Sequence, residues 1–171
     1  KPLDKITIRD LTEDCGISRM TFYYHFKDIY DLIEWACLAD ATKALAGKKT
    51  YDTWSEGLVQ IFEVVYENKP FILNAYRCIS RDQIENFLFH LTSDLLMGVV
   101  EEKAADTDIS EEDRRLIADF YKYSFVGIML DWIKQGMKDD YMELARKINI
   151  TIHGSLANSI LNFSNLAKTD L

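Results

Sequence analysis

The chain has 171 residues, of which 48% are hydrophobic, so it can bury a sizeable core as one domain or two small ones. Its formal net charge of -8 argues against a protein that coats nucleic acid without sequence preference. The longest apolar run, residues 125–130, stops at Asp131 and is far shorter than the ~20 residues of a membrane helix, so we expect no membrane partner.

Three cysteines, Cys15, Cys37 and Cys78, lie far apart in the sequence. An odd number at wide spacing suits reduced thiols better than a disulfide framework. No secretory signal is visible, and we expect a cytoplasmic protein.

Residues 6–27 carry a pattern that ordinary helix packing does not require. Thr7 is placed to cap a first helix over residues 8–15, because its hydroxyl can accept from the backbone N–H groups of the opening turn. Gly16 follows, and a glycine just past a helix end readily takes the left-handed conformation of a sharp turn. Ile17 is expected to fill the corner between the two helices.

A second helix is predicted over residues 19–25, capped by Ser18. Phe22 and Phe26 are four residues apart and define one packing face, whereas the other faces carry hydrogen-bond donors and two tyrosines. Two short helices in this order indicate a helix-turn-helix whose second helix can enter a major groove.

The remaining chain shows helical spacing of apolar residues and no alternating strand pattern, which predicts an all-α protein. Helices are expected over residues 28–46, 52–68, 70–79, 82–105, 111–135 and 139–168. We divide the chain into a helix-turn-helix DNA-binding domain at residues 1–46, connecting helix included, and an effector-binding and dimerisation domain at residues 47–171.

The charge pattern limits the DNA-binding interpretation. Residues 1–47 carry six basic and eight acidic side chains, so this end is not basic overall. Between Cys15 and Lys27, however, there is no acidic residue, while Arg19, His25 and Lys27 are present. Attraction for DNA is therefore expected from this short surface alone.

The last two predicted helices are apolar on more faces than one core can bury, which implies a second packing partner. We expect a two-fold dimer joined by a four-helix bundle, with Gly154 inside the last helix allowing close helix approach. The interface residues expected are Phe125, Ile128, Trp132, Ile152, Leu156, Ile160 and Phe163. The alternative is that both helices are central in the core of a monomer.

The motif resembles the DNA-binding motif of the TetR family of bacterial regulators. The residues that carry the resemblance are Thr7, Leu11, Cys15, Gly16, Ile17, Ser18, Arg19, Tyr23, Tyr24, His25, Phe26 and Lys27. Residues 127–137, GIMLDWIKQGM, are similar to the subgroup that includes regulators of dihydroxyacetone kinase operons. The family pattern begins with a helix before Lys1, so we expect the sequence to be part of a longer chain.

Three residues open the second helix, where side chains reach base edges most easily. Arg19 can donate two hydrogen bonds to guanine, and Met20 or Thr21 can contact a thymine methyl group, although a solvated surface arginine is the alternative for Arg19. The resemblance further implies phosphate contacts, which set register without reading sequence. The residues implied are Thr7, Ser18, Tyr23, Tyr24, His25 and Lys27.

The sequence contains none of the common nucleotide, hydrolase or zinc-protease motifs, and His25, His90 and His153 fall on different predicted helices. We therefore expect no catalytic residue, no metal site and no cofactor. The resemblance implies an effector cavity among the middle helices. Its candidate residues are Tyr76, Arg77, Cys78, His90 and Trp132, with ordinary half-buried positions as the alternative.

Three functions remain open. The first is a homodimeric regulator that binds a palindromic double-stranded DNA operator and is controlled by a small-molecule effector. The second is an activator of a dihydroxyacetone kinase operon that is controlled by a kinase-like protein co-regulator. The third is an all-α interaction module without DNA binding.

Overall fold

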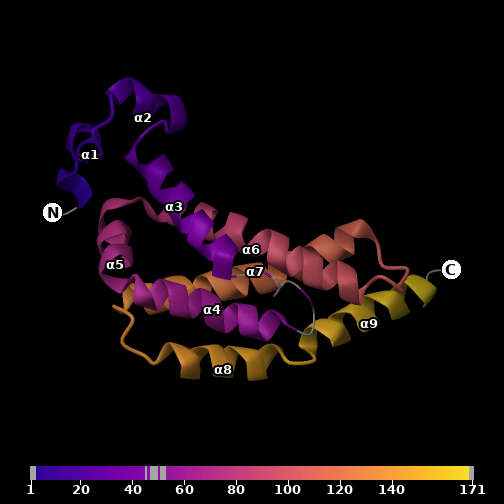
Figure 1. The fold of residues 1–171 in the computed structure, drawn as a ribbon. Coiled ribbons are helices and arrows are strands. Elements are labelled where there is room, and N and C mark those ends of the chain that lie inside the picture. The colour runs from indigo at the N-terminus through magenta and orange to yellow at the C-terminus, as the bar shows by residue number, and fades with distance from the viewer. Residues whose placement is uncertain (1–2, 45, 47–49, 51–52, 170–171) are drawn as a thin grey trace.

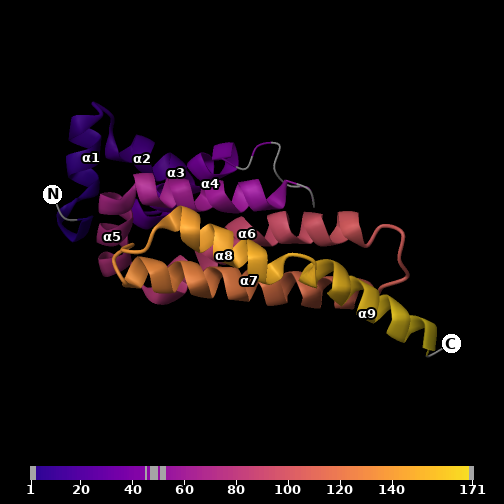
Figure 2. The same cartoon turned by 90° about the horizontal axis from the view of Figure 1, so that it is seen from below.

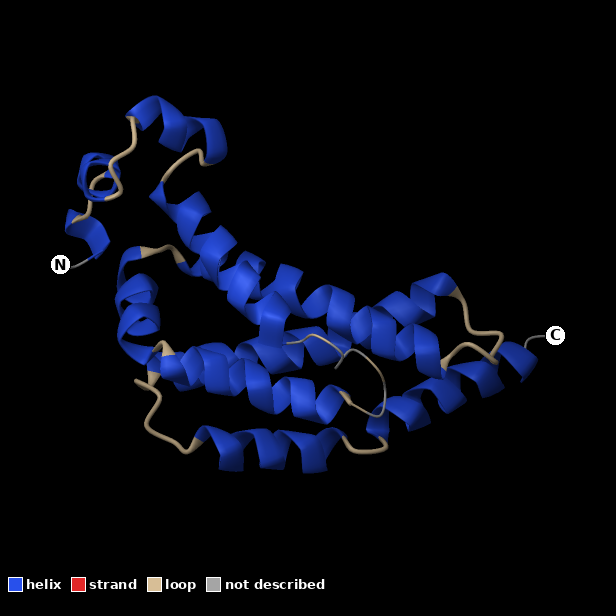
Figure 3. Cartoon of the chain, viewed as in Figure 1, coloured by secondary structure: helices blue, strands red, loops and turns tan. Residues whose placement is uncertain are grey.

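The computed structural model describes residues 3–44, 46, 50 and 53–169, and every regular element in these ranges is helical, as predicted (Figures 1 and 3). The elements are η1 (Leu3–Lys5), α1 (Ile8–Asp14), α2 (Arg19–His25), α3 (Ile29–Ala44), α4 (Trp54–Glu67), α5 (Lys69–Cys78), α6 (Arg81–Lys103), α7 (Glu111–Lys134), α8 (Tyr141–Ile152) and α9 (Ser155–Thr169).

The N-terminal elements η1, α1 and α2 project from one end of an elongated helical bundle (Figure 1). Helix α3 leads from this projection into the bundle, where it packs against α4 and α6. Leu38 of α3 is 43% exposed, so the connecting helix leaves part of its apolar surface accessible.

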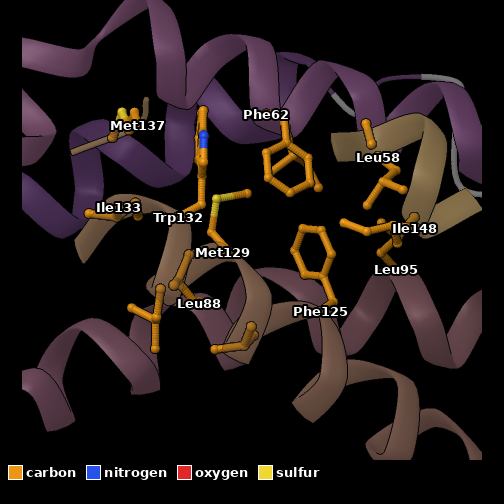
Figure 4. Packing of buried hydrophobic residues seen from close by; sticks show 14 residues of the cluster. Leu58, Phe62, Leu88, Leu95, Phe125, Met129, Trp132, Ile133, Met137 and Ile148 are labelled. Carbon is orange, nitrogen blue, oxygen red and sulfur yellow. The ribbon is translucent and has the colours of Figure 1, made fainter. Parts of the chain in front are cut away.

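The bundle core lies between α4, α6, α7 and α8. Helices α6 and α7 lie side by side as a long hairpin, and α8 covers α4 on the other side (Figures 1 and 2). Phe62 of α4 is fully buried and meets the rings of Phe125 and Trp132 at centroid distances of 5.8 and 5.3 Å (Figure 4). Met129 fills the space beside them. Large apolar and aromatic side chains thus hold the bundle together.

The expected helix over residues 139–168 is wrong, because the structure divides it into α8 and α9. The break lies at Gly154, whose φ of +76° is left-handed backbone that L side chains rarely adopt. A Cβ built on Gly154 would meet nothing within 4 Å, so this glycine serves the turn and not close helix packing. As a result α9 leaves the line of α8 and packs along the far ends of α6 and α7 (Figure 2).

The loop between α7 and α8 is tied to the start of α5. Gly136, at φ +81°, ends α7, and the N–H of Met137 donates to the carbonyl of Trp132 across 2.9 Å. Nζ of Lys69 then donates to the carbonyl oxygen of Met137 across 2.9 Å, and its ammonium lies 5.4 Å from the ring centroid of Tyr66. This lysine clamp joins the first turn of α5 to the end of α7.

Candidate DNA-binding surface and interdomain cavity

Local capping fixes the first helix of the motif. Oγ1 of Thr7 accepts from the N–H of Asp10 across 3.1 Å, and Oδ2 of Asp10 accepts from the N–H of Thr7 across 2.8 Å. At the other end Gly16 takes φ +64°, and the N–H of Ile17 donates to the carbonyl of Thr12 across 2.9 Å. This reciprocal cap and this glycine turn are set by local sequence, so both helix ends are well defined.

Helix α2 is capped by Ser18 in the expected way. Oγ of Ser18 accepts from the N–H of Thr21 across 3.1 Å, and the two hydroxyl oxygens lie 2.9 Å apart. The cap satisfies one of the free N–H groups of the opening turn and fixes the direction in which Arg19 and Met20 leave the backbone.

One face of α2 packs against the protein. Phe22 is buried, its ring lies 5.7 Å from that of Phe26, and Phe26 lies 5.7 Å from Trp35 on α3. Ile17 was expected to fill the corner between α1 and α2 but is 44% exposed. Thr12 of α1 is the buried residue of that helix instead. The aromatic contacts fix the orientation of α2 relative to α3.

The opposite face of α2 is open to solvent. Met20 and Tyr24 are the most exposed of its large side chains, at 82% and 84%, and Arg19, Thr21 and Tyr23 are exposed beside them. The rings of Tyr24 and His25 meet edge to face at 5.0 Å. Every residue expected to contact DNA from α2 therefore lies on the accessible side of the motif.

Thr7 differs from the other expected phosphate contacts. Its hydroxyl donates to Oδ2 of Asp10 across 2.7 Å, so its proton is already used and a carboxylate lies beside it. Lys27, at the other end of the motif, is exposed, and its side chain remains available. Phosphate binding is thus favoured at the α2 end over the Thr7 end.

The acidic residues that follow the motif are engaged with backbone at the start of α3. Oδ2 of Asp31 accepts from the N–H of Lys27 across 2.8 Å, and Oδ1 of Asp28 accepts from the N–H of Asp31 across 3.0 Å. Negative side chains are favourable at a helix N-terminus, where the backbone N–H groups carry partial positive charge. Both carboxylates thus serve the start of α3, and the segment from Ser18 to Lys27 contains no acidic residue of its own.

A cavity of about 520 Å³ lies where α3 meets α4, α5 and α6. Its volume is within the range of ordinary small-molecule sites, and its wall joins the connecting helix to the larger part of the chain. We call it the interdomain cavity. Of the residues expected in an effector site, Tyr76 and His90 line it.

The other three expected cavity residues lie elsewhere. Arg77 is exposed on α5, and Sγ of Cys78 is 3.8 Å from Oδ1 of Asn74. Trp132 is only 3% exposed, and its Nε1 donates to the carbonyl of Asp139 across 3.0 Å. Trp132 belongs to the core of the chain, so its assignment to the effector cavity is wrong.

Several residues expected at a dimer interface are likewise part of the chain's own core. They are Phe125, Trp132, Leu156 and Ile160, all of which the single chain buries by itself. Their burial supports the alternative that these positions pack within the monomer. Ile128, Ile152 and Phe163 keep part of their surface accessible.

Helix α7 nevertheless presents an apolar stripe to solvent. Its large members are Leu116, Phe120 and Tyr123, which recur at helical spacing, and Ile128 at the edge of the same side; all four are exposed. The neighbouring helix α9 exposes Leu161 and Leu166. We call these six side chains the α7–α9 stripe.

Other site chemistry is sparse in the described ranges. No group of three histidine, cysteine or acidic residues there is arranged to hold a metal ion, and no helix is long and apolar enough to cross a membrane. None of the three cysteines forms a disulfide.

A helix-turn-helix with an exposed second helix, joined to a larger helical domain with a cavity, is an arrangement typical of DNA-binding transcriptional regulators. Residues 52–154 match the family model described as the C-terminal region of transcriptional regulators of the TetR type. The chain therefore belongs to the TetR family of transcriptional regulators.

One solved structure with the same fold is named "Dihydroxyacetone kinase operon activator DhaS". It is 20% identical, with a TM-score of 0.67, and the alignment covers 96% of this chain and 89% of that one. No curated protein matches this chain in sequence. The resemblance to the dihydroxyacetone kinase subgroup expected from residues 127–137 thus agrees with the fold.

Proposed function

We propose that the protein binds a palindromic operator as a homodimer, with α2 of each subunit in successive major grooves about 34 Å apart. Residues 1–46 act as the DNA-binding domain and residues 47–171 as the effector-binding and dimerisation domain. The observation that carries the proposal is the exposed face of α2, capped by Ser18 and held from behind by Phe22.

Base-edge contacts are assigned to Arg19, Met20 and Thr21, because they open α2 and are exposed. Phosphate contacts are assigned to the hydrogen-bond donors that follow the first turn of α2, which are Tyr23, Tyr24, His25 and Lys27. Ser18 is exposed and is kept as a phosphate contact. Thr7 is the weakest candidate for a phosphate contact, because its hydroxyl already donates to the carboxylate of Asp10.

The test measures binding of the protein to DNA from the promoter region of its own gene. Fluorescence anisotropy follows this binding over a series of salt concentrations. Arg19→Ala should weaken specific binding by about 1–3 kcal/mol. Arg146→Ala is the matched control, because Arg146 is an exposed arginine on α8, far from the motif, paired with Glu143. If Arg19→Ala and Tyr24→Ala both fold and bind the operator as tightly as the parent, α2 is not the recognition helix. A parent protein without salt-dependent DNA affinity would instead favour the interaction module without DNA binding.

The α7–α9 stripe supports the dimer. Exposed large apolar side chains on two neighbouring helices suit a two-fold helix pairing in which the same residues meet from both subunits. Ile128, Ile152 and Phe163 are kept from the interface residues predicted from the sequence, and the buried members are replaced by Leu116, Phe120, Tyr123, Leu161 and Leu166.

The interdomain cavity supports control by a small molecule. A ligand there touches α3, which carries the recognition helix, as well as α5 and α6. The ligand lowers operator affinity if it favours a geometry in which the two copies of α2 no longer fit successive grooves. The size of this effect equals the difference between the ligand's binding free energies for that geometry and for the DNA-binding geometry.

A second candidate is an activator controlled by a kinase-like protein. It is favoured by the fold shared with a protein named as an activator of the dihydroxyacetone kinase operon. Co-purification with neighbouring gene products distinguishes the two. A metabolite that alone abolishes operator binding would count against the protein co-regulator.

A further inference from the structure

We propose that the interdomain cavity binds a hydrophobic organic cation, meaning a molecule with an apolar body and a positively charged group. The inference rests on the proposed function only in that it takes this cavity as the regulatory site. It names the chemical class of the ligand, which the family match leaves open.

The apolar body follows from the walls that α4, α5 and α6 provide. Ile61, Val65, Ile72, Phe87 and Leu91 are among the side chains that line the cavity. A ligand that removes such surface from water gains roughly 25 cal/mol per Å² of buried apolar area. A small, fully polar metabolite would gain little from these walls and would leave most of the cavity unfilled.

The positive charge follows from the carboxylates on the α3 side. Asp28, Asp31 and Glu34 all line the cavity, at spacings of three residues. Asp28 and Asp31 use one oxygen each to accept backbone N–H groups, which compensates part of their charge. Glu34 makes no hydrogen bond or ion pair with any residue that the structure describes, so its whole carboxylate is available to a ligand.

Positive side chains are scarce at the same place. Lys27 is the one lysine or arginine among the described lining residues, against the three carboxylates. Arg81, the nearby arginine at the start of α6, lies outside the lining and pairs with Glu85 at 2.7 Å. An anionic ligand, such as a fatty acid, would meet a net negative wall without a guanidinium to bind it.

Aromatic side chains complete the match. Tyr30, Phe71, Tyr76 and Phe87 come from α3, α5 and α6 and all line the cavity. The face of an aromatic ring attracts a cation, and this attraction is larger for weakly hydrated organic cations in a partly desolvated site. Carboxylates on one side and aromatic rings on the others are therefore suited to a delocalised or shielded positive charge.

The experiment compares two ions of the same shape and opposite charge by isothermal titration calorimetry, in potassium-free buffer and without DNA. The probes are tetraphenylphosphonium and tetraphenylborate. We expect the phosphonium to bind at least about tenfold more tightly, which corresponds to about 1.4 kcal/mol. Equal or tighter binding of the borate, or no binding of the phosphonium, overturns the inference.

Variants locate the bound ion. Glu34→Gln should weaken phosphonium binding about threefold, since the carboxylate is partly exposed to solvent. Glu112→Gln is the matched control, because Glu112 is an exposed acid on α7 outside the cavity. Ile72→Trp, checked for folding by circular dichroism, should occupy part of the cavity among its apolar walls and strongly weaken phosphonium binding. Phosphonium binding that Ile72→Trp leaves intact would place the ion elsewhere and overturn the inference.

The two proposals fail separately. Phosphonium that binds in the cavity to a protein with no operator affinity supports the ligand class and contradicts the proposed function. Operator DNA that is bound by the protein, and released by tetraphenylborate but not by the phosphonium, supports the function and contradicts the ligand class.

Discussion

The backbone N–H of Leu3 donates to Oδ1 of Asn74 across 3.4 Å, although the two residues are 71 positions apart. Leu3 is buried against α5, and η1 packs on this helix. Ile72 and Ala75, on either side of Asn74, line the interdomain cavity. One turn of α5 thus touches both the cavity and the segment that leads into the DNA-binding motif.

Replacing Asn74 by alanine is expected to loosen η1 from α5. Loss of one net hydrogen bond is worth about 0.5–1.5 kcal/mol, so amide exchange at residues 3–5 should become roughly two- to tenfold faster. Hydrogen exchange read by mass spectrometry measures this, and α4 should not change. Arg77→Ala, exposed on the same helix and outside the cavity, is the control. Unchanged exchange at residues 3–5 would contradict the coupling role of Asn74.

Lys27 and Arg19 should differ in how they affect operator binding. Lys27→Ala removes one proposed phosphate contact, so it should weaken binding to all sequences alike and reduce the slope of log K against log salt by about 1. Arg19→Ala should instead reduce the preference for operator over unrelated DNA. Anisotropy titrations on both DNAs at several salt concentrations separate the effects, and an identical loss for the two variants would contradict the assignment.

Phe120→Glu is expected to dissociate the proposed dimer. The substitution places a charge in the middle of the α7–α9 stripe, where two-fold symmetry would bring it close to its own copy. Sedimentation equilibrium reports the change in mass. Met142→Glu is the matched control, since Met142 is similarly exposed but lies on α8. A monomeric parent protein, or a Phe120→Glu protein that remains dimeric, would contradict this interface.

Gly154 and Gly127 should respond in opposite ways to alanine. Gly154 has φ +76°, so Gly154→Ala places an alanine in left-handed backbone conformation and should cost about 1–2 kcal/mol of stability. Gly127 lies inside α7 with nothing within 4 Å of an added Cβ, so Gly127→Ala should stabilise by up to about 1 kcal/mol. Urea denaturation gives both values, and a tolerated Gly154→Ala would contradict the strained turn.

The pH dependence of stability should include a term from Glu143. Hydrogen bonds from Arg146 lower the pKa of Glu143 from 4.5 to about 2. A carboxylate with a depressed pKa in the folded state stabilises fully above pH 4.5, and this contribution is lost as the pH falls towards 2. The melting-temperature difference between the parent and Glu143→Gln should therefore shrink between these values. Because the pair is exposed, the difference is expected to be small.

The helix-turn-helix could be predicted almost residue by residue, because its limits are set by local chemistry. Thr7, Gly16 and Ser18 act within one turn of themselves, and α2 begins and ends where its sequence predicts. The break at Gly154 could not be predicted in this way, because a glycine inside a helix and one that ends a helix look alike when polar and apolar residues continue on both sides.

The interior could be predicted only in outline. Trp132 is apolar whichever partner buries it, so helical spacing alone cannot decide between Phe62 of the same chain and a second subunit. The position of the three acidic residues in the cavity lining could not be predicted for a similar reason. Asp28, Asp31 and Glu34 look like a solvated helix face until α5 and α6, far along the chain, are placed opposite them.

The lysine clamp gives α5 one fixed end. Lys69 holds the first turn of this helix to the carbonyl of Met137, whereas Cys78 in the last turn has its sulfur beside Asn74 of the same helix. When a helix is held at one end, a force on its middle displaces each residue by an amount that grows with the distance from the held end. Ile72 lies close to Lys69, and Asn74 lies further along the helix. A bulky ligand that displaces Ile72 would therefore displace Asn74, and with it the hydrogen bond to Leu3, by a larger distance.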